Sequence, residues 1–113
     1  MPVQSGGGAS GGSWGTAPVG YTAYDSEQLT LAELTTLTAA KVSPAGTAET
    51  LVLLQVDTAP IRWKVGASAS ATVGEQMAAG DVLELQFPRA ALLALTMYPV
   101  SGTPVVNVQY FYR

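Results

Sequence analysis

The chain has 113 residues, of which 12% are charged and 48% hydrophobic, and it contains neither cysteine nor histidine. A chain of this length forms one domain at most, and the missing residue types exclude disulfides, thiolate metal sites and histidine-dependent catalysis. The formal net charge of -3 argues against a nucleic-acid phosphate backbone as partner. The low charge content is typical of a subunit packed among other proteins, because a solvated monomer normally carries denser charge.

The N-terminal residues show no basic region followed by an apolar core, so we expect no signal peptide. The longest apolar run, Ala90 to Leu95, is far too short to span a bilayer. We therefore expect no membrane partner and synthesis in the cytoplasm of the producing cell.

Residues 1–20 hold more than half of the 12 glycines of the chain, mixed with serine, alanine and proline. Such a composition is typical of a flexible tail, because it cannot offset the entropy that is lost on ordering. The alternative is an extended arm that lies across a neighbouring subunit. We expect the arm, followed by a β-domain over residues 21–113, and predict that Trp14, Val19 and Tyr21 bind the partner.

Residues 21–42 give an ambiguous pattern. Their leucines fall at helical spacing, whereas the threonines between them are poor helix formers. We expect a strand over residues 28–32, a turn or one helical turn over residues 33–37, and then an extended piece. Residues 43–46 form a loop.

The next two segments read clearly as strands. Thr50 to Asp57 is almost continuously apolar, which predicts a strand covered on both faces. After a turn at residues 58–60, the segment Ile61 to Val65 alternates between apolar and basic residues, as expected for a strand with one face in a core. Trp63 shares the apolar face, so we favour a place in the core over the alternative of a ligand-stacking platform.

A second alternating strand follows the Gly80-Asp81 turn, with Leu83, Leu85 and Phe87 on one face. We expect positive φ angles at the glycines that end these segments, because glycine adopts them most cheaply. Further strands are predicted over residues 92–98 and 105–112, and the last should be internal to a sheet or completed by another chain. Six to eight strands result, which predicts an all-β, antiparallel sandwich of two sheets.

The carboxylates show no recognisable acid-base pair or metal-ligand spacing, and the glycine-rich start lacks the context of a phosphate-binding loop. We therefore nominate no catalytic, cofactor-binding or metal-binding residue, and we expect a protein that is not an enzyme. A calcium site built from aspartates and backbone carbonyls stays open as an alternative.

Four short segments resemble the small β-sandwich proteins encoded among the structural genes of tailed bacteriophages: Ile61-Arg62-Trp63, Ala71-Thr72-Val73-Gly74, Ala79-Gly80-Asp81 and Asn107 to Arg113. The resemblance extends over roughly residues 48–113, and the glycine-rich arm departs from the common pattern. It implies a jelly-roll-like sandwich and a virion protein of the head decoration or cement type.

Such a protein would bind the outer capsid surface and brace neighbouring major capsid subunits. The partner would be the major capsid protein, and the chain would form a dimer or trimer on the particle. A tail or head-fibre attachment module and a carbohydrate-binding sandwich remain as alternatives.

Overall fold

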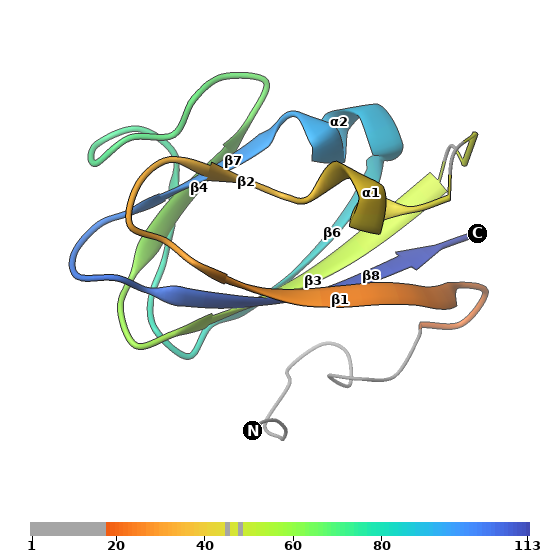
Figure 1. Cartoon of the computed structure of the whole chain (residues 1–113), viewed down its shortest axis with the longest axis horizontal. Coiled ribbons are helices and arrows are strands. Elements are labelled where there is room, and N and C mark those ends of the chain that lie inside the picture. Colours follow the sequence, from red (N-terminus) through yellow and green to blue (C-terminus); the bar gives the residue numbers. More distant parts are fainter. Residues whose placement is uncertain (1–17, 45, 48) are drawn as a thin grey trace.

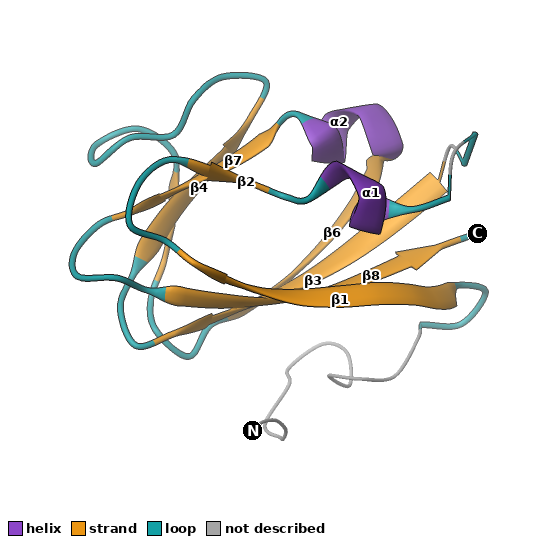
Figure 2. Cartoon of the chain, in the orientation of Figure 1, coloured by secondary structure: helices purple, strands orange, loops and turns teal. Residues whose placement is uncertain are grey.

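The computed structural model describes residues 18–44, 46–47 and 49–113. These residues form eight strands and two short helices (Figures 1 and 2). In chain order the elements are β1 (Thr22–Thr30), β2 (Thr35–Thr36), α1 (Ala39–Val42), β3 (Glu49–Asp57), β4 (Ile61–Val65), β5 (Glu75–Met77), β6 (Val82–Pro88), α2 (Arg89–Leu93), β7 (Leu95–Pro99) and β8 (Val105–Tyr112).

The strands form two antiparallel sheets that pack against each other, in the orders β1-β8-β3-β6 and β2-β7-β4-β5 (Figure 1). The first strand pairs with the last, the second with the seventh, the third with the sixth and the fourth with the fifth. This pairing results when one long antiparallel hairpin rolls up into two layers, which is the jelly-roll topology. The predicted all-β sandwich with jelly-roll-like character is confirmed.

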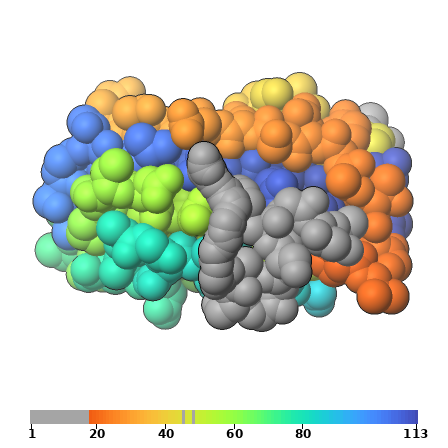
Figure 3. Space-filling model, turned by 90° about the horizontal axis from the view of Figure 1, so that it is seen from below, coloured from red at the N-terminus to blue at the C-terminus, as the bar shows by residue number. Residues whose placement is uncertain are grey.

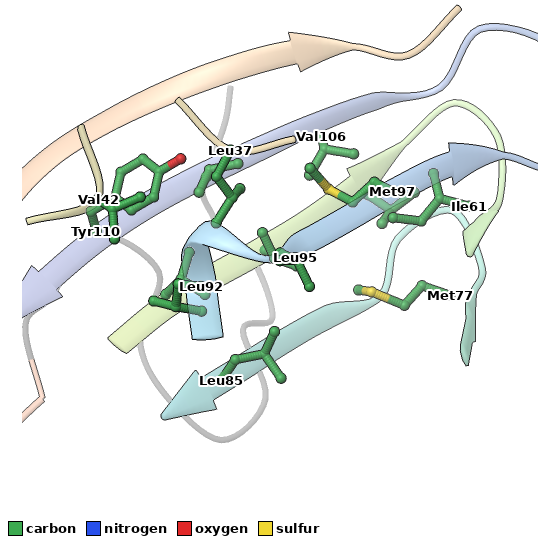
Figure 4. Packing of buried hydrophobic residues seen from close by; sticks show 14 of the residues in the cluster. Leu37, Val42, Ile61, Met77, Leu85, Leu92, Leu95, Met97, Val106 and Tyr110 are labelled. Atoms are coloured by element: carbon green, nitrogen blue, oxygen red, sulfur yellow. The ribbon is translucent and has the colours of Figure 1, made fainter. Parts of the chain in front are cut away.

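The core lies between the two sheets and is apolar on both sides (Figure 4). One sheet contributes Val52, Leu54, Val56, Val106, Val108 and Tyr110, and the other contributes Ile61, Leu95, Met97 and Met77. Val42 of α1 and Leu92 of α2 are also fully buried. The two short helices therefore complete the core beside the sheets, since each adds an apolar side chain to the same cluster.

Several sequence predictions are confirmed. Strand β4 spans the predicted residues, β8 does too, and β3 begins one residue before the predicted Thr50. The five residues from Leu51 to Gln55 show the expected coverage on both faces, four of them being buried. Strand β8 pairs with β1 on one side and β3 on the other, so it is internal to its sheet.

The segment between β4 and β6 was not predicted to hold a strand. It contains the short strand β5, which pairs with β4, so β4 and β6 belong to different sheets. A three-residue strand is too short to show alternation in the sequence. Gly74 precedes it with a φ of 120°, and a Cβ at this position would lie 2.7 Å from the Trp63 carbonyl oxygen. The loop therefore requires glycine where it crosses the β4 backbone.

The predictions near the two helices were also inaccurate. Strand β1 begins at Thr22, well before the expected start. Within residues 33–37, where a turn or one helical turn was expected, Thr35–Thr36 form the short strand β2. The helix follows it, because Val42 can then enter the core from α1. Helix α2 likewise occupies the start of the strand expected over residues 92–98, and β7 begins only at Leu95.

Candidate contact surface

The outer face of the β1-β8-β3-β6 sheet is the face turned away from the core, and Figure 3 looks onto this side of the molecule. Alternate residues of β3 point to opposite faces, so Leu51, Leu53 and Gln55 lie on the outer one. The strands are in register, with Leu51 opposite Phe111 and Gln55 opposite Asn107. The outer side chains therefore form rows across the sheet. The rows are apolar at one end of the strands and polar at the other.

The apolar end of this face consists of Leu51, Leu53 and Phe111, which form a cluster separate from the main core. Each of the three is at most 2% exposed. Among the described residues, the partly buried hydrophobic residue that packs against the cluster is Tyr21. The start of the described chain therefore lies against this end of the sheet.

Tyr21 is held in place by the last residue of the chain. The Arg113 guanidinium carbon lies 4.9 Å from the centroid of the Tyr21 ring, a cation-π distance. The Arg113 Nε donates to Glu49 Oε1 at 2.5 Å, and this carboxylate raises the pKa of Arg113. A hollow of about 240 Å³ lies beside these residues and extends over Thr50 and Phe87.

The polar end of the same face carries a row of amides across three strands. The Gln28 amide on β1 donates to Asn107 Oδ1 on β8 at 2.9 Å. The Asn107 amide donates in turn to Gln55 Oε1 at 3.3 Å and to Asp57 Oδ2 at 3.0 Å, both on β3. These groups satisfy one another, so the row fixes the strand register and leaves a shallow hollow of about 310 Å³ above it.

A carboxylate on the edge strand β1 serves the packing of the sandwich. Glu27 accepts hydrogen bonds from the backbone N–H of Thr38 at 3.1 Å, from its hydroxyl at 2.6 Å and from the buried Tyr110 hydroxyl. Burial of Tyr110, reinforced by the Glu27 carboxylate, raises the pKa of the phenol far above its usual value. The arrangement ties β1 to the segment before α1, and Glu27 is fully engaged in it.

Asp25, also on β1, has a similar structural role. The backbone N–H of Ser26 donates to Asp25 Oδ1 at 2.8 Å, and the Lys41 ammonium lies 3.3 Å from Oδ2. The Ser26 hydrogen bond, helped by Lys41, lowers the pKa of Asp25. The ion pair adds a second link between β1 and α1.

A third hollow borders Trp63 near the short strand β5. Trp63 packs against the core as expected but remains partly exposed. A hollow of about 430 Å³ beside it is lined by Glu75 and Asp81 among others. Arg62 fastens the adjoining loop, because its guanidinium donates to the carbonyl oxygens of Ala71 at 3.1 Å and Gly74 at 2.9 Å.

The three residues predicted to bind a partner lie in different surroundings. Trp14 lies outside the described residues. Val19 is 98% exposed, and Tyr21 packs on the apolar end of the outer face. Sequence reasoning missed Leu51, Leu53 and Phe111 as surface-side residues. The continuous apolar run of β3 could have indicated them. In a two-layer fold only one face of a strand packs in the core, so a strand that is apolar on both faces must also be covered on its outer side.

The described part of the chain contains no group of three or more Asp, Glu, His or Cys residues placed to hold a metal ion. None of its helices is long and apolar enough to cross a membrane.

In comparisons with known proteins, no family model matched the chain, and no significant match was found among curated proteins or solved structures.

Proposed function

We propose that the protein is a non-enzymatic structural component of a virion, which binds the outer capsid surface and stabilises contacts between major capsid subunits. The resemblance of residues 48–113 to phage structural proteins supports this role. The jelly-roll topology is in keeping with it, because this architecture recurs in viral capsid domains. Lectin domains share the topology, so the fold alone does not choose the function.

The observation that carries the proposal is the apolar end of the outer face, located where the N-terminal residues join the sandwich. Tyr21 packs on Leu51, Leu53 and Phe111, while Val19, two residues earlier, is 98% exposed. An exposed apolar side chain two residues before the anchored Tyr21 suits contact with another protein. The low charge of the chain reduces the desolvation cost of such a contact.

In this proposal residues 1–20 reach a neighbouring subunit on the capsid surface, and Trp14, Val19 and Tyr21 contribute apolar contacts. The chain forms a dimer or trimer on the particle, so several weak contacts act together through multivalency. The protein is then located on the virion, after synthesis in the host cytoplasm. Clamping of capsid subunits needs geometry and contact area, and it needs no catalytic residue.

The test is binding of the purified chain to capsid shells of the encoding virus that lack it. We expect saturable co-sedimentation with the shells and an increase in their resistance to heat. Val19→Ser should weaken binding, because it removes an apolar contact. Val73→Ser is the matched control, since Val73 is 44% exposed and lies in the loop before β5, away from the outer face.

Absence of binding by the full chain would contradict the proposed function. Equal loss of binding in the Val19 and Val73 variants would contradict the contact surface. Both valine variants should keep the wild-type melting temperature, because neither side chain is buried.

One observation favours carbohydrate binding as a second candidate function. Trp63 is partly exposed beside a hollow lined by Glu75, Asp81 and Gln76. An indole face with nearby carboxylates suits stacking on a sugar ring and hydrogen bonding to its hydroxyls. A glycan-binding screen tests this candidate. A bound glycan that quenches the fluorescence of Trp63 in a Trp14→Phe variant would support it, and a screen without any binding would remove it.

A further inference from the structure

The apolar end of the outer face is unusual for the outside of a sandwich. A sheet that packs on a second sheet with one face normally presents polar side chains on the other. Here Leu51, Leu53 and Phe111 lie on that other face and are at most 2% exposed. Among the described residues, Tyr21 is the hydrophobic residue that packs against them, and its own side chain is only partly buried.

The chain itself leads to this place. Tyr21 N–H donates to the Pro18 carbonyl at 3.0 Å, and the Tyr21 ring touches the apolar cluster. Residues 1–17 continue directly from Pro18. At about 3.3 to 3.6 Å per residue they can extend roughly 60 Å, and Trp14, four residues before Pro18, can reach at most about 14 Å from it.

The composition of residues 1–17 suits an apolar surface. They contain no acidic and no basic side chain, and they include the apolar residues Met1, Val3 and Trp14. An uncharged segment can lie on an apolar face without burying an unpaired charge. Its many glycines also let the backbone approach that face closely.

We infer that the apolar end of the outer face is the docking site for residues 1–17 of the same chain in the isolated protein, with Trp14 as the main apolar contact. The same chain is favoured over a second copy because Tyr21 already holds the start of the segment at the site. Such a tether produces a high effective concentration, in the millimolar range for short linkers.

This inference concerns the protein off the particle and does not rest on the proposed function. It links to that function in one respect. A segment that binds a neighbouring subunit on the capsid would first leave its own sandwich, so attachment would exchange one apolar contact for another. The free protein would then keep its contact residues protected until the partner surface is present.

Fluorescence of Trp14 provides the test. The chain has two tryptophans, so Trp14 is the single emitter in the Trp63→Phe variant. We expect a blue-shifted emission and slower quenching by acrylamide than for a free peptide of residues 1–17. Both properties should be the same at high and at low protein concentration, because docking occurs within one chain.

Two substitutions in this background locate the contact. Leu53→Gln should shift the Trp14 emission toward that of the free peptide, whereas Val73→Ser, far from the outer face, should leave it unchanged. Circular dichroism checks that each variant is folded. Should Leu53→Gln fail to fold, deletion of residues 1–17 replaces it, and this deletion should increase binding of an apolar dye to the exposed cluster.

A Trp14 emission equal to that of the free peptide would overturn the inference. A blue shift that disappears on dilution would also overturn it, since the segment would then be bound to a second copy. A deletion that leaves dye binding unchanged would count against it too. None of these measurements involves capsid shells, so they can fail while the proposed function stands, and the reverse is equally possible.

Discussion

The two faces of the β1-β8-β3-β6 sheet are built from the same strands and differ in a simple way. On β3 the inner positions Val52, Leu54 and Val56 are all fully buried and apolar. The outer positions change from leucine at one end to the amide and carboxylate of Gln55 and Asp57 at the other. Over these three residues of β3 the inner face is thus apolar, as a core requires, whereas the outer face is divided into two regions with different contacts.

The two faces therefore have different roles: the inner face forms the folded core, and the outer face is available for contact with other segments. The inner face packs against the opposite sheet and the two short helices, so its side chains hold the sandwich together. The polar end of the outer face is satisfied by its own amide row. The apolar end is buried although no second sheet faces it; Tyr21 packs on it, and it lies where the described chain enters the sandwich.

The largest effect is expected on the inner face. Leu54→Ala removes a fully buried side chain from the centre of β3 and should lower the free energy of unfolding by about 2 to 5 kcal/mol. Urea denaturation followed by circular dichroism measures the loss. If the free energy of unfolding fell by no more than it does for an ordinary surface substitution, the core would not be organised around β3.

The neighbouring residue on the outer face should behave differently. Leu53→Ala should cost about 1.5 to 3 kcal/mol in the full chain, the value of burying a leucine. In a chain without residues 1–17 the same substitution should lower the free energy of unfolding by clearly less. The proposed cover is then absent both before and after the substitution, so Leu53 has less burial to lose. A double-mutant cycle measures this coupling, and equal costs in the two backgrounds would argue that the cluster is covered without the N-terminal segment.

A polar group on the inner face gives the third prediction. Tyr110→Phe should cost about 1 to 3 kcal/mol near neutral pH, because the hydroxyl donates to the Glu27 carboxylate. Because the pKa of Tyr110 is raised in the folded chain, the free energy of unfolding should decrease at high pH. The folded chain keeps the phenol protonated, whereas the unfolded chain loses the proton above about pH 10, so stability is lost as pH rises beyond that value.

The contribution of Tyr110 to this loss should be about 1.4 kcal/mol per pH unit above pH 10. The difference in stability between the wild type and Tyr110→Phe should therefore shrink as the pH is raised, which denaturation at pH 8 to 11 can measure. A difference that stays constant over this range would mean that the phenol ionises equally in both states.

The smallest effect is expected at the polar end of the outer face. Asn107→Ala removes the centre of the amide row and should cost about 0.5 to 1.5 kcal/mol, the net value of ordinary hydrogen bonds. Thermal denaturation measures the shift. Trp14 fluorescence in the Trp63→Phe background should stay unchanged, and a shift there would extend the docking site beyond the apolar end.

Much of the division between an inner and an outer face of the sheet could be predicted from the sequence. Alternation placed Leu83, Leu85 and Phe87 on one face of β6, and all three contact the core. The continuous apolar run of β3 indicated two covered faces. What covers the outer one could not be predicted, because a hydrophobic pattern states that a side chain is buried and does not name its neighbour.

The remaining errors have local causes. The strands β2 and β5 have two and three residues, too few for any period to appear. The helices α1 and α2 have four and five residues, and each is fixed by one side chain that enters the core rather than by helix propensity. Tertiary packing decides such short elements, so sequence reasoning located the long strands and missed these.

The most direct test of the account is an NMR measurement of nuclear Overhauser effects between the Trp14 indole and the methyl groups of Leu51 and Leu53 in the full chain. We predict cross-peaks to both leucines, which persist when labelled protein is diluted with unlabelled protein. Random-coil shifts for Trp14 without any cross-peak to these methyl groups would contradict the claim that the outer face receives the N-terminal segment.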